Sequence, residues 1–197
     1  MAFFDFSADH VLEDDVVRLR PLHADDWEAL RPYADETALW KFSTIRVQNA
    51  EDLKAYISLA LDGRTKREEY PFSVFDKRRN RYAGSTRFYD IQPEKGTLQL
   101  GYTWYGTEFH GSGLNRHSKF LLLRFAFETL GMERVEFRAD VLNEKSVAAM
   151  KSIGCTVEGV LRSHIPKPDG TRRDTVVLGI LRHEWFDSVR GALAQKL

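Results

Sequence analysis

The most constraining feature of the sequence is a glycine turn between a predicted strand and a predicted helix. The strand covers 97–105, the turn contains Gly111-Ser112-Gly113, and an apolar helix follows over 114–130. The first N–H groups of a helix have no partner within it, and the macrodipole adds partial positive charge there. Because glycine lacks a Cβ, a phosphate can approach such a turn closely. The pattern predicts an anion site, and a plain turn with Ser112 as N-cap is the alternative.

Two common phosphate-binding motifs do not fit this turn. A P-loop ends in Gly-Lys-Ser/Thr, whereas this turn continues as Gly113-Leu114-Asn115. The dinucleotide-binding fingerprint requires a third Gly or Ala where Arg116 stands, and it usually opens the first βαβ unit. The turn therefore predicts an anion site of another kind.

The order of periodic segments predicts one domain of the α/β (α+β) class, with a mixed sheet flanked by helices. Seven strands are predicted, at 16–22, 70–75, 82–89, 97–105, 134–140, 156–164 and 174–181. Helices are predicted at 24–33, 50–61, 114–130 and 143–153, with a short one from 184. We expect an N-terminal extension over 1–15, the domain itself over 16–185, and a C-terminal helix or tail over 186–197.

Composition excludes several classes of protein. Lys+Arg and Asp+Glu both number 29, so no bulk charge favours a nucleic acid or an anionic membrane as partner. The single cysteine, Cys155, excludes an intrachain disulfide, and no His/Asp/Glu cluster has metal-ligand spacing, so no metal is expected. The N-terminus lacks the pattern of a signal peptide, and no apolar stretch reaches the roughly 18–20 residues of a membrane span. We expect a cytoplasmic protein.

Four sequence pieces carry a resemblance to a known family. They are Leu100-Gly101-Tyr102-Thr103-Trp104; Glu108-Phe109-His110-Gly111-Ser112-Gly113; Asn143-Glu144-Lys145-Ser146 with Ile153-Gly154; and Glu158-Gly159-Val160-Leu161-Arg162 with Arg173-Asp174. In this order they resemble the GNAT family of acetyl-CoA-dependent N-acetyltransferases, and within it the RimJ/RimL-like branch. The resemblance covers nearly the whole chain, from about 16 to 185.

The resemblance implies an acetyltransferase that moves the acetyl group of acetyl-CoA to a primary amine, on a protein or peptide N-terminus or a small molecule. It implies a seven-stranded, mostly antiparallel sheet that splays into a V around coenzyme A, between strands 97–105 and 134–140. The pyrophosphate would lie on the glycine turn, and a backbone N–H near Trp104 or Tyr105 would polarise the thioester carbonyl. The implied cofactor-binding residues are Thr103, Trp104, Tyr105, His110, Gly111, Ser112, Gly113, Leu114, Asn115, Arg116, Asn143 and Ser146.

Two residues are candidates for catalysis. The resemblance places the cofactor sulfur at the helix start that carries Ser146, and the Ser146 hydroxyl would protonate the departing thiolate. The alternative, from spacing alone, is that Asn143 and Ser146 are an N-cap and N3 pair. His164 is a candidate base because histidine titrates near neutral pH, with a hydrogen-bonded strand histidine as the alternative. A carboxylate proposed as base in some relatives falls near Ile165, so the base is left open.

Several side chains carry further expectations. Glu108 stands where the family pattern has Gln or Arg, so its carboxylate is expected to point away from the pyrophosphate, with Arg116 supplying positive charge. His117 and Lys119 are expected to be exposed, with contact to a coenzyme A phosphate as the alternative, and Asp174 is expected to pair with Arg162 or Arg173.

Other functions remain open at this point. They are a coenzyme A-binding regulatory module without transfer activity and an acyltransferase that uses a longer acyl-CoA. The sequence also leaves a homodimer open.

Overall fold

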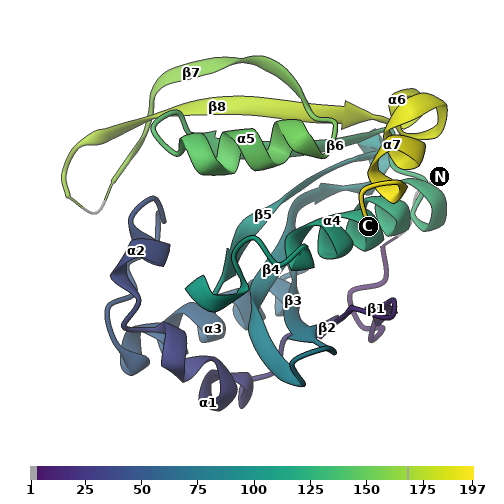
Figure 1. Cartoon of the computed structure of the whole chain (residues 1–197). Coiled ribbons are helices and arrows are strands. Elements are labelled where there is room, and N and C mark those ends of the chain that lie inside the picture. Colours follow the sequence, from purple (N-terminus) through teal and green to yellow (C-terminus); the bar gives the residue numbers. More distant parts are fainter. Residues whose placement is uncertain (1–3, 168) are drawn as a thin grey trace.

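The computed structural model describes residues 4–167 and 169–197, and it contains an eight-stranded sheet in the order β1-β2-β3-β4-β5-β6-β8-β7 (Figure 1). The strands are β1 Leu12–Glu13, β2 Val17–Pro21, β3 Glu69–Asp76, β4 Arg81–Gln92, β5 Thr97–Tyr105, β6 Arg134–Asp140, β7 Thr156–Pro166 and β8 Arg172–Leu181. Every neighbouring pair is antiparallel except β5 and β6, which are parallel. The predicted fold class, a mixed and mostly antiparallel sheet with helices, is confirmed.

The helices cover both faces of this sheet. They are α1 Asp26–Leu30, α2 Thr37–Trp40, α3 Ala50–Thr65, α4 Leu114–Arg124, α5 Glu144–Ser152, α6 Arg182–Glu184 and α7 Arg190–Ala194. A π-helical turn, Phe125–Thr129, continues α4 to the end of the predicted helix, and a second one, Trp185–Val189, joins α6 to α7. None of the helices in the described part of the chain is long and apolar enough to span a membrane.

The sheet divides where β5 meets β6. The two strands pair only at Thr97, Leu98 and Gln99, opposite Arg134, Val135 and Glu136. Beyond these residues they diverge, so that β1–β5 form one arm, and β6, β8 and β7 with α5 form the other (Figure 1). The V between strands 97–105 and 134–140 is therefore present in the structure.

Adjacent residues of β4 show which helix covers which face. Successive side chains of a strand point to opposite faces. Thr86 Oγ1 lies 2.7 Å from Thr103 Oγ1, which in turn accepts a hydrogen bond from Lys119 of α4. The neighbouring Arg87 packs against the ring of Tyr56 of α3 instead. Helices α3 and α4 therefore cover opposite faces of the first arm.

The structure differs from the expected seven strands by one. The short strand β1, with Leu12 opposite Leu19 and Glu13 opposite Arg18, adds an eighth strand at the edge of the first arm. Two residues give too short a pattern for alternation to be recognised in a sequence, which explains why this strand was missed. The helix α2 was also not predicted, because four residues are too few for a helical period to be recognised.

Gly84 fixes how closely β4 and β5 approach each other. A Cβ added at this position would lie 2.0 Å from the carbonyl oxygen of Trp104. We predict that Gly84→Ala lowers the free energy of unfolding by roughly 1–3 kcal/mol, because the two strands would have to separate. Urea denaturation measures the effect. Gly159→Ala is the control, because no described residue lies within 4 Å of its added Cβ; equal stability of the two variants would contradict the prediction.

Candidate active site

The glycine turn forms an open cradle at the start of α4. Gly111 and Gly113 have φ values of +73° and +86°, and no described residue lies within 4 Å of a Cβ built on either. In the described part of the chain, neither of their N–H groups has a backbone acceptor. Gly113 is the N-cap, while Ser112 Oγ donates to the Phe109 carbonyl at 2.7 Å. The backbone thus presents donors at a helix start, and Ser112 is not the N-cap.

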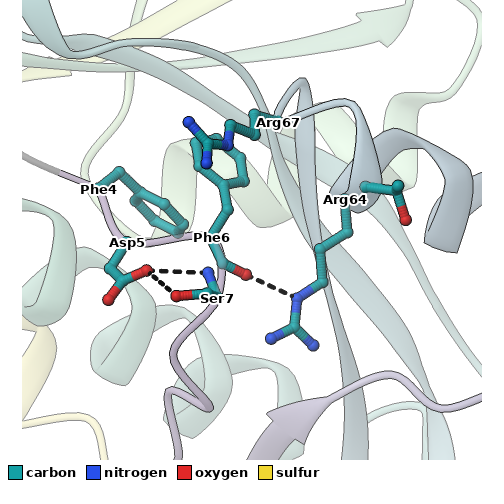
Figure 2. Close-up of a pocket in the computed structure, with 7 residues that line it drawn as sticks. Phe4, Asp5, Phe6, Ser7, Arg64 and Arg67 are labelled. Atoms are coloured by element: carbon teal, nitrogen blue, oxygen red, sulfur yellow. Dashed lines mark hydrogen bonds between the residues drawn. The ribbon is translucent and has the colours of Figure 1, made fainter.

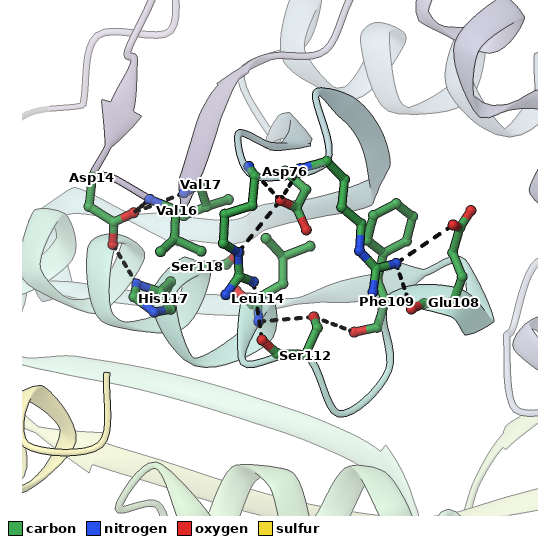
Figure 3. A network of polar contacts seen from close by, with 12 residues as sticks. Asp14, Val16, Val17, Asp76, Glu108, Phe109, Ser112, Leu114, His117 and Ser118 are labelled. Carbon is green, nitrogen blue, oxygen red and sulfur yellow. Dashed lines mark hydrogen bonds and ion pairs between the residues drawn. The ribbon is translucent and has the colours of Figure 1, made fainter.

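Glu108 points away from this cradle. Its carboxylate lies 3.3 Å from Arg81, the first residue of β4, and 3.6 Å from Arg79 in the turn between β3 and β4. Figure 3 shows Glu108 on the far side of Phe109 from Ser112. A second arginine of the same turn, Arg78, donates to the Ser112 carbonyl at 3.1 Å. A cation therefore lies beside the cradle while the nearby carboxylate is held elsewhere, as expected for Glu108.

The first turns of α4 are fixed by contacts with distant segments. The Nδ1 atom of His117 lies 2.7 Å from the Asp14 carboxylate (Figure 3), and its side chain is only 12% exposed. The exposed Arg116 donates to the Lys196 carbonyl at 2.7 Å, near the C-terminus. Leu114 is fully buried and Asn115 is half-buried. The expectation that His117 is exposed was wrong, because the segment before β2 covers it.

The start of α5 lies beside the glycine turn. Asn143 is its N-cap and accepts the Ser146 N–H at 3.1 Å. The two residues are therefore the N-cap and N3 pair that their spacing predicts. The Lys145 amine lies 2.9 Å from Nδ1 of His110, whose Nε2 lies 3.0 Å from the Tyr105 carbonyl. These contacts bring the end of β5, the glycine turn and the helix that carries Ser146 to the same region.

Strand β5 contains a bulge at the open end of the V. Arg87 is opposite Gly101 and Ser85 is opposite Trp104, so Tyr102 and Thr103 together face the single residue Thr86. Tyr102 adopts a left-handed φ of +48°, which is unusual for a residue with a side chain. A bulge disrupts the local ladder of hydrogen bonds and turns backbone groups in a new direction. Here it affects the backbone just before Trp104 and Tyr105.

Trp104 and Tyr105 are themselves buried, at 7% exposure each. The Trp104 ring packs against Trp40, with ring centroids 4.9 Å apart. Neither the Trp104 Nε1 nor the Tyr105 hydroxyl has a hydrogen-bond partner in the described part of the chain. Their side chains hold β5 in place, which leaves the backbone as the part of these residues available to a ligand.

Lys119 is buried beneath the bulge, contrary to the expectation that it is exposed. Its side chain is 5% exposed, and its amine donates to Thr103 Oγ1 at 2.7 Å and lies 5.8 Å from the centre of the Phe137 ring of β6. It thus extends between the two strands that form the V. Burial lowers the pKa of this amine to about 7, an effect that the neighbouring Cys155 partly opposes.

His164 lies on the second arm. Its Nδ1 is 3.0 Å from Thr175 Oγ1, and its pKa is lowered by burial and by the charges of Arg138, Arg173 and Arg172. No hydrogen bond joins it to Ser146 within residues 4–167 and 169–197. The structure therefore brings the start of α5, which carries Ser146, to the glycine turn through Lys145 and His110, whereas His164 has no hydrogen bond to that turn among the described residues.

The comparisons with known proteins agree with this geometry. The family model described as an acetyltransferase (GNAT) domain matches residues 17–156, which is most of the chain. The chain belongs to the GNAT family of acetyltransferases. Within it, the match is to the RimJ/RimL-like group, so the predicted family and the predicted enzyme class are both confirmed.

Individual relatives support the same conclusion. The uncharacterised N-acetyltransferase p20 of Bacillus licheniformis is 26% identical over 172 residues, covering 85% of this chain and 93% of that protein. A candidate ribosomal N-acetyltransferase of Bacillus subtilis, YdaF, is 32% identical over 52% of this chain and 55% of its own length. The crystal structure of a candidate acetyltransferase from T. thermophilus is 32% identical, has a TM-score of 0.86, and covers 97% of this chain and 98% of that one.

The sequence analysis did not predict where three positively charged side chains near the glycine turn lie: Arg78, Lys145 and the buried Lys119. The turn that carries Arg78 is 34 residues from the glycine turn, and no local pattern connects them. Helical spacing could have indicated that Lys119 is buried. It lies three residues before the buried Leu122 of α4 and four after Asn115, so it shares a helix face with them.

A pocket of about 400 Å³ lies away from the candidate active site. It is lined by residues 4–7 together with Arg64, Thr65 and Arg67 at the end of α3 (Figure 2). None of the predicted site residues is among them. In the described part of the chain, no three or more His, Cys, Asp or Glu side chains are grouped so that they could hold a metal ion.

The buried amine of Lys119 gives a test by pH. Because its pKa is about 7 in the folded protein and near 10.5 in the unfolded chain, only the unfolded chain binds this proton between those values. Stability should therefore rise with pH from 7 upward, by at most about 1.4 kcal/mol per pH unit from this group. We predict that Lys119→Met removes this rise, as measured by urea unfolding at pH 6 to 9.

The matched control for this measurement is Lys151→Met at an exposed position of α5, which should keep the wild-type slope. A Lys119→Met variant whose stability has the same pH dependence as that of the wild type would contradict the assignment. Comparison of slopes, rather than of single values, removes the contributions of other titrating groups.

Proposed function

We propose that this protein is an N-acetyltransferase that moves the acetyl group of acetyl-CoA to a primary amine by direct attack. The observation that carries the proposal is the coincidence of the open strand pair β5–β6 with the glycine cradle at the start of α4. Membership of the GNAT family implies acetyl-CoA as co-substrate. The amine would belong to a protein or peptide N-terminus or to a small molecule.

The residues present fit the pyrophosphate of coenzyme A. The open space at Gly111 and Gly113 is where a Cβ would otherwise stand, and the start of α4 supplies oriented N–H groups and positive partial charge. Ser112, Leu114 and Asn115 would contribute backbone groups, and His110, Arg116 and Arg78 line the surroundings. Thr103, Trp104 and Tyr105 would offer the free edge of β5 to the pantetheine arm.

Acetyl-CoA supplies an activated acyl group as a thioester. In the proposed step, the amine nitrogen forms a bond to the carbonyl carbon and the carbon–sulfur bond breaks. A backbone N–H near Trp104 or Tyr105 would stabilise the negative charge that develops on the carbonyl oxygen. The amine proton would pass to a base, for which His164 is the candidate, and Ser146 would return a proton to the thiolate, helped by Asn143, which fixes the start of α5.

The properties of His164 are compatible with this role. Burial and three arginines lower its pKa, so its ring is neutral and able to accept a proton at pH 7. A role for His164 requires the acceptor, or a water molecule, to bridge to the second arm. Ile165, next to it, carries no titratable group.

Two alternative functions can be distinguished from the proposed one by experiment. A coenzyme A-binding module without transfer activity would bind acetyl-CoA but release no thiol in the presence of amines. An acyltransferase for longer chains would prefer a longer acyl-CoA in direct competition. A cytoplasmic location and a homodimer also stay predictions; the exposed Val157, Val160 and Leu161 on the edge strand β7 are compatible with a partner copy.

The cradle can be tested by filling it. We predict that Gly111→Val weakens coenzyme A binding at least tenfold, because a branched side chain would occupy the space assigned to the pyrophosphate. Isothermal titration calorimetry with coenzyme A measures this. Gly170→Val is the matched control, since it too has a positive φ, +82°, and an open surrounding, but lies in the β7–β8 turn. Unchanged affinity in the Gly111 variant would reject the cradle.

The proposed acid can be tested separately. We predict that Ser146→Ala lowers kcat at least tenfold while leaving coenzyme A affinity nearly unchanged. The variant keeps the backbone N–H that Asn143 accepts, so α5 should remain capped. Steady-state thiol release measures kcat, and Ser152→Ala at the exposed end of α5 is the control. A kcat equal to that of the control would exclude Ser146 as the acid.

A further inference from the structure

The face of the sheet opposite α4 carries an arginine that has no ion-pair partner in the described part of the chain. Thr175 of β8 is opposite Asp140 of β6, and alternation along β8 places Arg173 on the same face as Thr175. Phe137 faces Lys119 of α4, so its neighbour Arg138 points to the other face, as Asp140 does. Arg173 therefore lies on the second arm, on the side of the V away from the helix that begins at the glycine cradle.

Arg173 is buried without the contacts that buried arginines usually have. Its side chain is 9% exposed, and its Nε has no hydrogen-bond partner among the described residues. Asp174, expected as an ion-pair partner, instead accepts the Ser163 N–H at 2.7 Å, so that expectation was wrong. Within residues 4–167 and 169–197, no carboxylate forms an ion pair with this guanidinium. Burial lowers the pKa of Arg173, and the charge of the nearby Asp140 only partly offsets this effect.

Most of the other charged groups on this face form ion pairs with one another. Glu136 pairs with Arg134 and Arg138, at 2.9 and 2.7 Å. Across the V, Glu69 pairs with Arg87 at 2.5 Å. Asp140 accepts the Leu142 N–H through Oδ1 at 3.0 Å, whereas its buried Oδ2 lies 3.9 Å from Lys167 and has no hydrogen-bond partner among the described residues.

The neighbouring Arg172 also has no acidic partner among the residues the structure describes, but alternation along β8 points it to the opposite face. Its guanidinium donates to Ser163 and to the His164 carbonyl. The ion pairs of this face therefore leave Arg173 as its unbalanced charge, whereas Arg172 belongs to the opposite face.

Arg173 lies among the groups that border the open end of the V. Burial raises the pKa of Tyr89 and Tyr102, and the charge of Arg173 opposes that rise in both. The two tyrosine rings are 5.0 Å apart, and the guanidinium of Arg87 lies 4.2 Å from the ring of Tyr102. Tyr102 is the residue of the β5 bulge, so the charge of Arg173 acts on the region where the proposed acyl transfer would occur.

An uncompensated buried charge is costly, and a bound anion removes that cost by pairing with it. A planar guanidinium is also well matched to a carboxylate, which it can bind through two parallel hydrogen bonds. We propose that the acceptor of this enzyme is an amine that carries its own carboxylate, and that Arg173 binds this carboxylate while the amine faces the bulge of β5. The proposal rests on the proposed acetyltransferase function and names the class of its acceptor.

The same charges disfavour the opposite class of amines. A polyamine or another polycationic acceptor would bring further positive charge to Arg173, where the nearby carboxylate of Asp140 already lies beside Lys167. A neutral amine would leave Arg173 uncompensated. The structure therefore favours free amino acids and related anionic amines over cationic ones.

The test compares free α-amino acids with the corresponding amino-acid amides, which lack the carboxylate. With acetyl-CoA in excess, thiol release and mass spectrometry of the product give kcat/KM for each pair, alongside spermidine as a cationic amine. We expect the wild type to prefer the carboxylate form at least tenfold. Arg173→Gln should remove this preference through KM, Arg173→Lys should retain part of it, and Arg172→Gln, the exposed neighbour, should retain most of it.

A binding measurement separates this proposal from the proposed catalysis. N-acetylated amino acids and their amides are titrated into the protein saturated with coenzyme A. Tighter binding of the carboxylate form that is lost in Arg173→Gln supports the anion site. If this result is obtained while no amine is acetylated, only the proposed transfer activity is rejected. Equal binding of both forms, a preference for spermidine, or a preference unchanged in Arg173→Gln would overturn the proposal.

Discussion

The interruption of backbone pairing between β5 and β6 is the constraint on which the rest of the structure depends. Parallel strands that pair for only three residues and then diverge leave two rows of backbone groups without partners, and such groups are costly unless water or a ligand satisfies them. Packing on each arm holds the strands apart, because Trp104 is fixed against Trp40 and the second arm has its own antiparallel pairing with β8. A ligand with amide groups can complete the ladder that the fold itself cannot close.

A neutral chain can therefore bind an anionic cofactor without a basic surface. The equal numbers of acidic and basic residues exclude a bulk electrostatic attraction, but they say nothing of local fields. At the glycine turn the donors are backbone groups, the carboxylate of Glu108 is held by Arg79 and Arg81, and Arg78 lies beside the Ser112 carbonyl. The favourable potential arises from the arrangement of a few groups at one helix start rather than from composition.

The parts of the site that local chemistry determines were predictable from the sequence. Glycines with positive φ, an Asn cap and the strand–turn–helix order are encoded by residues close together in the chain, and the structure has each of them. Arg78, the Asp14–His117 contact and the missing partner of Arg173 depend on segments far apart in sequence, so no spacing rule reveals them. Lys119 lies between these cases: helical periodicity indicates its buried side, but only the tertiary structure shows that it reaches Thr103.

A positively charged side chain is buried on each face of the V, and the two faces differ in how the cost of burying that charge is reduced. Near α4 the group is a lysine, which can lose its proton, so burial is relieved by lowering its pKa to about 7. On the opposite face the group is Arg173, and a guanidinium keeps its charge at any ordinary pH. A residue that cannot be neutralised by deprotonation has to be compensated by an anion. Because of this difference, we expect the lysine to govern how stability depends on pH, and we propose that the arginine governs which acceptor binds.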